Sequence, residues 1–67
     1  MNQLSQTLNE GRHGLIDVTG LAERLGVSER FVRRLIAERR VPFFKVGKFI
    51  RFDSTDIDQW IETRRVV

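Results

Sequence analysis

Two helical patterns joined by almost no connecting residues constrain the fold of this chain more than any other feature. The first pattern ends at Gly26, a residue that tolerates the left-handed backbone of a helix exit, and Thr19 is placed to cap its start. Its apolar residues share one helical face: Leu21, Ala22 and Leu25. The second pattern starts at Ser28, directly after Val27. The turn is so short that the two helices must pack against each other.

The second pattern, residues 28–40, combines an apolar stripe with a strongly basic opposite face. Ser28 is a good N-cap, and Glu29 suits the positive end of the helix dipole. The stripe consists of Val32, Leu35 and Ile36. At about 100° per residue, the side chains that point away from the stripe are Arg30, Arg34 and Ala37, with Phe31 and Arg33 on its two flanks. Arginines around a small alanine suit the negatively charged major groove of DNA.

The two helices together match the helix-turn-helix pattern, which requires apolar or small residues where the helices cross. The matching residues are Leu21, Ala22, Leu25, Gly26, Val27, Val32 and Leu35. Ala22 has to be small because the second helix crosses there, and Gly26 has to tolerate the turn. A basic outward face behind this pattern favours DNA binding, and a structural helix pair without a nucleic-acid role is the alternative.

Residues 41–52 predict a β-hairpin, and Pro42 ends the helix before it. A two-residue turn at Gly47 and Lys48 would mix Arg51 into the apolar face. A three-residue loop, residues 47–49, instead gathers the apolar side chains over the core: Phe44, Val46, Ile50 and Phe52. We therefore expect the three-residue loop.

This register predicts a basic wing. Lys45 and Arg51 then stand together on the side away from the core, and Lys48 and Phe49 lie at the tip, where they can reach phosphates. We expect the Phe49 ring to fold back on the core; insertion into a groove and contact with a neighbouring protein are the alternatives.

A third helix is expected after the hairpin. Asp53 is placed as its N-cap with Asp56 in the first turn, and an apolar stripe that closes the core follows: Ile57, Trp60 and Ile61. Carboxylates are common in a first helical turn, and no nucleophile, histidine partner or phosphate-binding glycine loop accompanies them. We therefore expect neither an enzyme nor a catalytic site.

Composition excludes several other classes of protein. The chain has no cysteine and one histidine, His13, so neither a disulfide framework nor a four-ligand zinc site is available, and no cofactor or small-molecule ligand is expected. It contains no apolar run of membrane-spanning length and no secretory signal. We expect a cytoplasmic protein with a flexible N-terminal arm at residues 1–14, in which Arg12 could touch DNA, a domain at residues 15–63 and a C-terminal tail at residues 64–67.

Positive charge is concentrated in the middle of the chain. Residues 28–51 carry a net charge of +6, whereas residues 1–27 carry −1 and residues 52–67 carry −2. Such a run can be an ordinary solvated face, but here it falls on the outward side of the second helix and on the hairpin. The distribution favours a nucleic-acid partner.

The stretches 17–36, 42–48, 51–53 and 56–61 resemble the excisionase-type branch of the MerR-like winged-helix domains, over about residues 15 to 62. The resemblance implies an α+β fold: a small winged helix-turn-helix with a two-stranded hairpin wing and a C-terminal helix. The outward face of the second helical pattern and the resemblance together predict five residues for the major groove: Ser28, Arg30, Phe31, Arg33 and Arg34. For the wing and the DNA backbone they predict Lys45, Lys48, Phe49 and Arg51.

The resemblance implies a phage excisionase that binds and bends attachment-site DNA. A single winged helix covers one half-site of contacts, so we expect neighbouring copies of the chain and a phage integrase as partners, in the nucleoid of a bacterial host. Because the sequence stops at Val67, we expect no long dimerisation helix of the kind found in a ligand-responsive regulator. A small phage or plasmid transcriptional regulator is the first alternative. The second is a protein-interaction module, such as an antitoxin-like partner, whose basic face meets an acidic protein.

Overall fold

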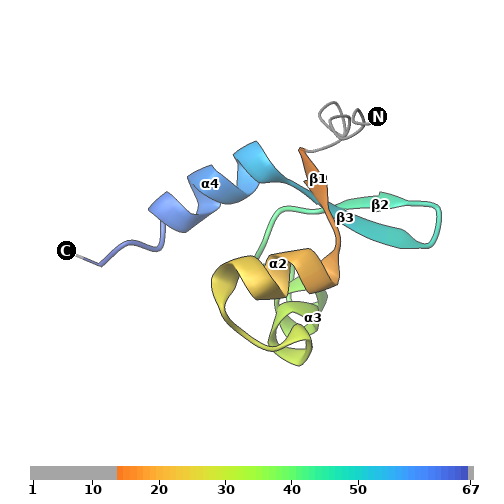
Figure 1. Cartoon of the computed structure of the whole chain (residues 1–67), viewed down its shortest axis with the longest axis horizontal. Coiled ribbons are helices and arrows are strands. Elements are labelled where there is room, and N and C mark those ends of the chain that lie inside the picture. The colour runs from red at the N-terminus through yellow and green to blue at the C-terminus, as the bar shows by residue number, and fades with distance from the viewer. Residues whose placement is uncertain (1–13, 67) are drawn as a thin grey trace, which may run out of the picture.

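The computed structural model describes residues 14–66, and they form an α+β winged helix-turn-helix (Figure 1). The elements follow in the order β1 (Leu15–Ile16), α2 (Val18–Leu25), α3 (Glu29–Ala37), β2 (Phe44–Val46), β3 (Phe49–Asp53) and α4 (Ser54–Glu62). Helices α2 and α3 pack together under a small sheet, and α4 and the β2–β3 hairpin extend from it to opposite sides (Figure 1). Apart from Gly14, the predicted N-terminal arm with Arg12 lies outside the described residues.

Helix α2 begins two residues earlier than the sequence predicts. Its N-cap is Asp17, whose Oδ1 accepts a hydrogen bond from the Gly20 N–H at 2.8 Å, so the prediction of Thr19 as the cap was wrong. An ionised carboxylate is a strong acceptor for the orphan N–H groups at a helix start. Thr19 instead donates its hydroxyl to Glu29 Oε2 at 2.8 Å, which ties the start of α2 to the start of α3. Gly26 ends α2 with φ 71°, as predicted.

Helix α3 is capped by Ser28 as predicted, but it ends at Ala37, well before Pro42. The chain leaves the helical path at Arg39, two residues after Ala37, because Arg39 adopts the left-handed conformation with φ 54°. The Arg40 N–H then bonds to the Leu35 carbonyl at 2.9 Å, which is the closing bond of a Schellman motif. This position is usually glycine, so the arginine there carries backbone strain.

The sheet has three antiparallel strands in the order β1-β3-β2, one more than the predicted two-stranded wing. Its register corrects the prediction of a three-residue loop. The paired residues are Phe44 with Arg51, Lys45 with Ile50, and Val46 with Phe49. A two-residue turn therefore joins the strands, and Gly47 adopts φ 62° at its first position, where tight hairpins of this kind need glycine.

This register turns half of the predicted core residues of the hairpin outward. Phe44 and Val46 are 48% and 59% exposed, whereas Phe52 is fully buried. Directly paired residues share a face of the sheet. Lys45 pairs with Ile50, whereas Arg51 pairs with Phe44, the neighbour of Lys45 in β2, so Lys45 and Arg51 lie on opposite faces and not together. Phe49 is 53% exposed and does not fold back on the core, so that prediction was also wrong.

The core of the described residues is an apolar cluster from the three helices, β3 and the loop after α3. Its members are Val18, Leu21, Ala22, Val32, Leu35, Val41, Phe52 and Ile57. The predicted helical stripes supply most of it, with Ile36, Trp60 and Ile61 partly buried at its edge. Val27, one of the residues that match the helix-turn-helix pattern, is 37% exposed.

Helix α4 is fixed to the helix-turn-helix by polar contacts as well as by packing. Asp53 caps it as predicted and accepts from the Thr55 N–H at 2.8 Å. Trp60 Nε1 donates to the Arg40 carbonyl at 2.7 Å, and the Arg64 guanidinium lies 5.0 Å from the Trp60 ring centroid. Arg24 of α2 forms an ion pair with Asp58 of α4. The Trp60 bond therefore ties the loop after α3 to α4, and the ion pair ties α2 to α4.

Candidate nucleic-acid interface

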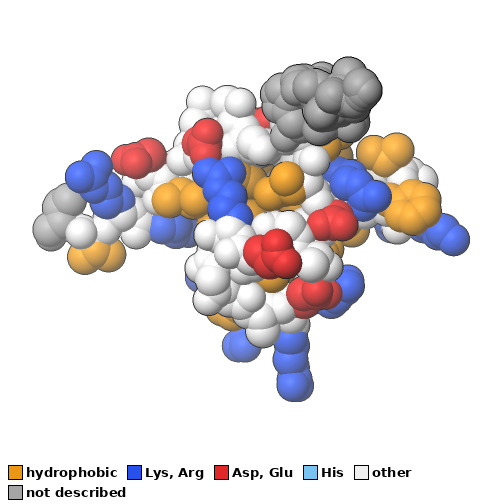
Figure 2. Space-filling model, in the orientation of Figure 1, with side chains coloured by type: hydrophobic (Ala, Val, Ile, Leu, Met, Phe, Trp, Pro, Cys, Tyr) orange, Lys and Arg blue, Asp and Glu red, His pale blue; other side chains and the backbone are white. Residues whose placement is uncertain are grey.

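The outward face of α3 presents the five residues that the sequence predicts for the major groove. We call this face the recognition surface: Ser28, Arg30, Phe31, Arg33 and Arg34. All five are exposed, because Val32 and Leu35 point the opposite side of the helix into the core. The five residues line one shallow hollow. In Figure 2 the Lys and Arg side chains project from the lower edge of the molecule, where α3 lies.

Hydrogen bonds and ion pairs fix parts of this surface. Ser28 Oγ accepts from the Phe31 N–H at 3.0 Å, which leaves its hydroxyl proton free to donate to a phosphate. Arg33 pairs with Glu29 at 3.8 Å, and Arg34 pairs with Glu38 at 3.8 Å. These are exposed pairs at i,i+4 spacing, so each contributes only about 0.3–0.5 kcal/mol and is easily exchanged for a phosphate contact.

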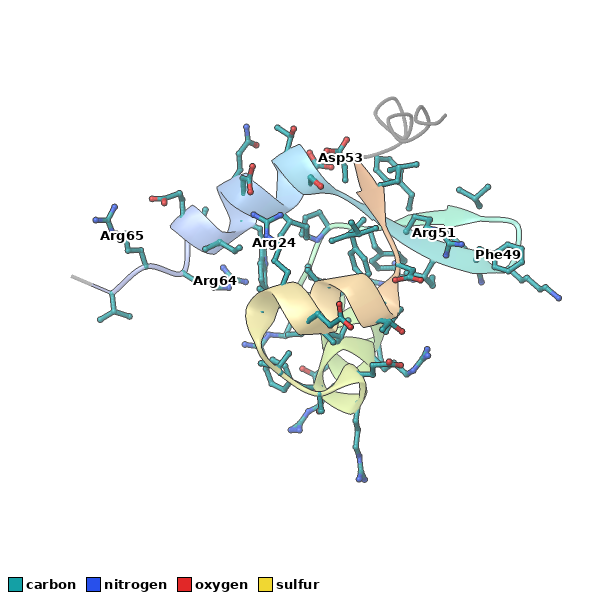
Figure 3. The ribbon with its side chains drawn as sticks, viewed as in Figure 1. Arg24, Phe49, Arg51, Asp53, Arg64 and Arg65 are labelled. Atoms are coloured by element: carbon teal, nitrogen blue, oxygen red, sulfur yellow. The ribbon has the colours of Figure 1, made fainter. Side chains whose placement is uncertain are left out.

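Arg30 and the three wing cations Lys45, Lys48 and Arg51 have no carboxylate within 4 Å among residues 14–66. Phe49 lies between two of these cations at the wing tip: the Lys48 Nζ is 5.6 Å and the Arg51 guanidinium carbon 5.4 Å from its ring centroid. Arg51 also donates to the Ile50 carbonyl at 2.7 Å. Figure 3 shows Phe49 and Arg51 side by side on the wing. The aromatic ring therefore holds two cations at the end of the hairpin.

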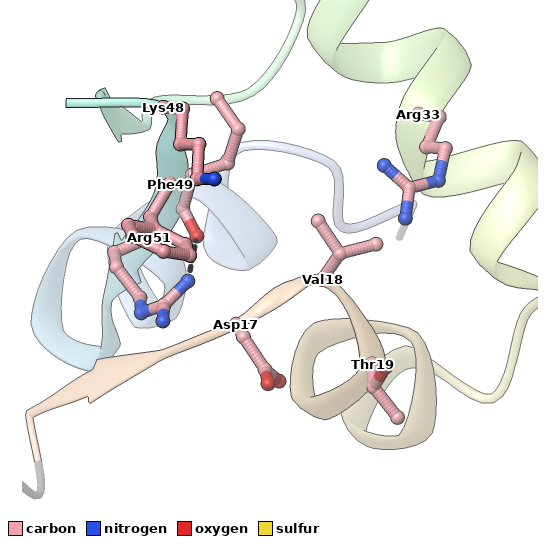
Figure 4. Close-up of a pocket in the computed structure, with 8 residues that line it drawn as sticks. Asp17, Val18, Thr19, Arg33, Lys48, Phe49 and Arg51 are labelled. Carbon is pink, nitrogen blue, oxygen red and sulfur yellow. Dashed lines mark hydrogen bonds between the residues drawn. The ribbon is translucent and has the colours of Figure 1, made fainter. Parts of the chain in front are cut away.

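A hollow of about 240 Å³ connects the wing to the recognition surface (Figure 4). Arg33 enters it from α3, and Lys48, Phe49 and Arg51 enter it from the wing. The start of α2 forms its floor, where Asp17 is already engaged as the N-cap. Three cations from two separate elements thus border one open hollow, which is an arrangement suited to a polyanion that passes between helix and wing.

Lys45 is the one predicted wing residue that the structure separates from the others. It lies on the edge strand β2 and borders a different hollow, together with Leu15, Phe44, Val46 and Asp53. In the hairpin, Lys45 pairs with Ile50 and not with Arg51. The predicted pair of Lys45 and Arg51 is therefore replaced by a cluster of Lys48, Phe49 and Arg51.

The structure also reveals an apolar surface that sequence reasoning missed. We call it the outer sheet face: Leu15, Phe44, Val46 and Phe49, which are 46% to 59% exposed. Figure 2 shows hydrophobic side chains beside Lys and Arg on the wing. The alternation of apolar residues around a two-residue turn would have predicted this surface, because it pairs Val46 with Phe49. The prediction of a three-residue loop placed Phe44 and Val46 over the core instead.

Residues 14–66 contain no group of three His, Cys, Asp or Glu side chains that could hold a metal ion. Within the same residues, no helix is both long enough and apolar enough to cross a bilayer.

Comparison with known families identifies residues 15–65 as a helix-turn-helix domain. Searches of curated proteins and of solved structures gave no match. The family match covers the recognition surface, the wing and α4 together, and domains of this kind bind DNA and are generally not enzymes. The chain therefore belongs to the helix-turn-helix domain family of DNA-binding proteins.

Proposed function

We propose that this protein is an excisionase-type accessory factor that binds attachment-site DNA and directs a phage integrase toward excision. The family to which it belongs includes excisionase-like DNA-binding proteins. The observation that carries the proposal is the presence of three cations from helix and wing, Arg33, Lys48 and Arg51, beside one hollow. With α3 in the major groove, these cations follow the DNA backbone and bring the wing tip to the adjacent groove.

In this proposal the helix and the wing have different roles. Arg30 and Arg34 on α3 supply forked donors that suit a guanine edge, while Lys48 and Arg51 contact phosphates irrespective of sequence. Replacing Arg34 with Ala is expected to weaken binding by about 1 to 3 kcal/mol and to relax base preference. The variant Lys48→Ala is expected to weaken binding to all sequences alike. An unchanged preference in the Arg34 variant would contradict the assignment of the recognition surface.

Neighbouring copies of the chain are the proposed partners on DNA. A module of this size covers one half-site, so useful affinity needs several copies in a row. The outer sheet face supports this arrangement because three of its four exposed apolar residues lie on the wing, which extends from the body of the molecule toward an adjacent copy, and the fourth lies on β1. A contact there would remove apolar surface from water and couple the two binding events.

Cooperativity provides the test of this partner. Gel-shift titrations on duplexes with one site and with two adjacent sites separate intrinsic affinity from coupling. The variant Val46→Ser is expected to keep the affinity for one site and to lose most of the coupling on two. Coupling that survives the substitution unchanged would exclude the outer sheet face as the contact between copies.

Transcriptional regulation is the second candidate function. It can be distinguished from recombination by whether the protein bends its DNA and strengthens the binding of integrase. An excisionase acting beside integrase bends its sites, so circularly permuted duplexes with the selected site should change mobility with the position of the site. Purified integrase should also bind more tightly to DNA that already carries the protein. Unbent DNA and an integrase indifferent to the protein would favour the small regulator.

A further inference from the structure

Phe31 is an apolar side chain exposed among the three arginines of the recognition surface. It is 45% exposed and does not belong to the core cluster, to which α3 contributes Val32 and Leu35. Its backbone N–H is bound to Ser28 Oγ at 3.0 Å, so the ring stands on the first, capped turn of α3. The fold does not need a phenyl ring at this position, and exposing one to water is unfavourable.

The surroundings of the ring define what could contact it. The hollow beside Phe31 is lined by Ser28 and by three arginines, Arg30, Arg33 and Arg34. A matching ligand must therefore present an apolar group surrounded by hydrogen-bond acceptors and negative charge. The major groove of DNA offers this combination, because the 5-methyl group of thymine is its apolar feature and lies beside base acceptors and phosphates.

We propose that Phe31 contacts the 5-methyl group of a thymine and so gives the recognition surface a preference for thymine at one position. The proposal rests on the proposed binding of duplex DNA through α3. It assigns to Phe31 a role in specificity that is distinct from the general attraction of the surrounding arginines. The first turn of a recognition helix is the part that contacts base edges, which is where Phe31 lies.

The test removes the methyl group and nothing else. A binding site is first selected from random duplex, and each of its thymines is then replaced in turn by deoxyuridine, which pairs in the same way. Dissociation constants are measured by fluorescence anisotropy at one fixed salt concentration. For the unmodified protein, uracil at one position should weaken binding by about three- to tenfold, the effect of losing one buried methyl contact.

Two variants make the result specific to Phe31. Phe31→Ala should bind the thymine duplex more weakly, and uracil should then change its affinity by less than about twofold. Lys48→Ala, on the wing, should bind both duplexes more weakly and keep the thymine-to-uracil ratio of the unmodified protein. Because Phe31 lies outside the core, its variant should retain the circular dichroism spectrum and melting temperature of the folded chain.

The outcomes separate this proposal from the function on which it rests. If the protein binds its selected site but no thymine responds to loss of the methyl group, the proposal is overturned and DNA binding stands. The same holds if Phe31→Ala keeps the full ratio. If the unmodified protein shows no binding to duplex DNA, the proposed function itself fails, and an acidic protein surface with an apolar centre becomes the better partner for Phe31.

Discussion

Glu38 places a negative charge at the edge of the recognition surface, and its removal is expected to tighten DNA binding. It is the C-cap of α3, and its carboxylate lies 3.8 Å from Arg34 Nε and 3.2 Å from Arg40 Nη1. In a complex, this carboxylate would face the same phosphates as the arginines. The variant Glu38→Gln keeps the shape of the side chain and removes only the charge.

The size of the gain follows from Coulomb repulsion. A carboxylate about 7 Å from a phosphate in water is repelled by about 0.6 kcal/mol, and two such phosphates give about 1.2 kcal/mol. The expected gain in affinity is therefore about three- to eightfold at low salt. Stability should fall by less than about 1 kcal/mol, because both ion pairs are exposed and a carboxylate at a helix C-terminus is itself unfavourable.

The matched control is Glu62→Gln, which makes the same chemical change in an exposed pair with Arg65 at the end of α4. Both variants raise the net charge by one unit, so a comparison of their dissociation constants at about 50 mM salt isolates the position of the charge. Glu38→Gln should bind several-fold more tightly than Glu62→Gln. Equal gains would mean that only net charge matters, and that Arg34 does not contact DNA.

Three further predictions concern the backbone and the wing. Arg39→Gly should raise the free energy of unfolding by about 0.5 to 1 kcal/mol, seen as a higher melting temperature, because glycine relieves the strain at φ 54°; a lower melting temperature would contradict the strain. Trp60→Phe should lower the free energy of unfolding by about 1 kcal/mol, because the Arg40 carbonyl loses its 2.7 Å bond and keeps only the longer 3.3 Å bond from Arg64; an unchanged melting temperature would show that the tryptophan bond contributes nothing. Gly47→Val should distort the turn at φ 62° and flatten the salt dependence of DNA binding, and the wing would have no part in binding if the salt dependence stayed the same.

Helix positions could be predicted from the sequence because their signals are local. The Ser28 and Asp53 caps, the Gly26 exit and the apolar stripe with Val32 and Leu35 depend on residues within one or two turns of each other. The exposed face of α3 follows from the same spacing. The end of α3 was missed because a left-handed Arg39 leaves no compositional signal, whereas Pro42 does.

The hairpin register could not be predicted locally, because it depends on how many apolar side chains the core can hold. The predicted register required a three-residue loop because it placed four apolar residues over the core: Phe44, Val46, Ile50 and Phe52. The core of this small domain has room for Phe52 and part of Ile50, so Phe44 and Val46 remain outside. A shift of one residue in register exchanges the two faces of a strand. Strand β1 was missed as a sheet member because two residues are too few to show a period.

The salt dependence of binding to random duplex DNA tests the central claim most directly, since contact of α3 and the wing with phosphates must release counterions. A plot of the logarithm of the association constant against the logarithm of the salt concentration should have a slope of roughly −3 to −6, as expected when several phosphates are neutralised. A flat plot would contradict DNA binding through these surfaces and would favour a protein partner for the basic face.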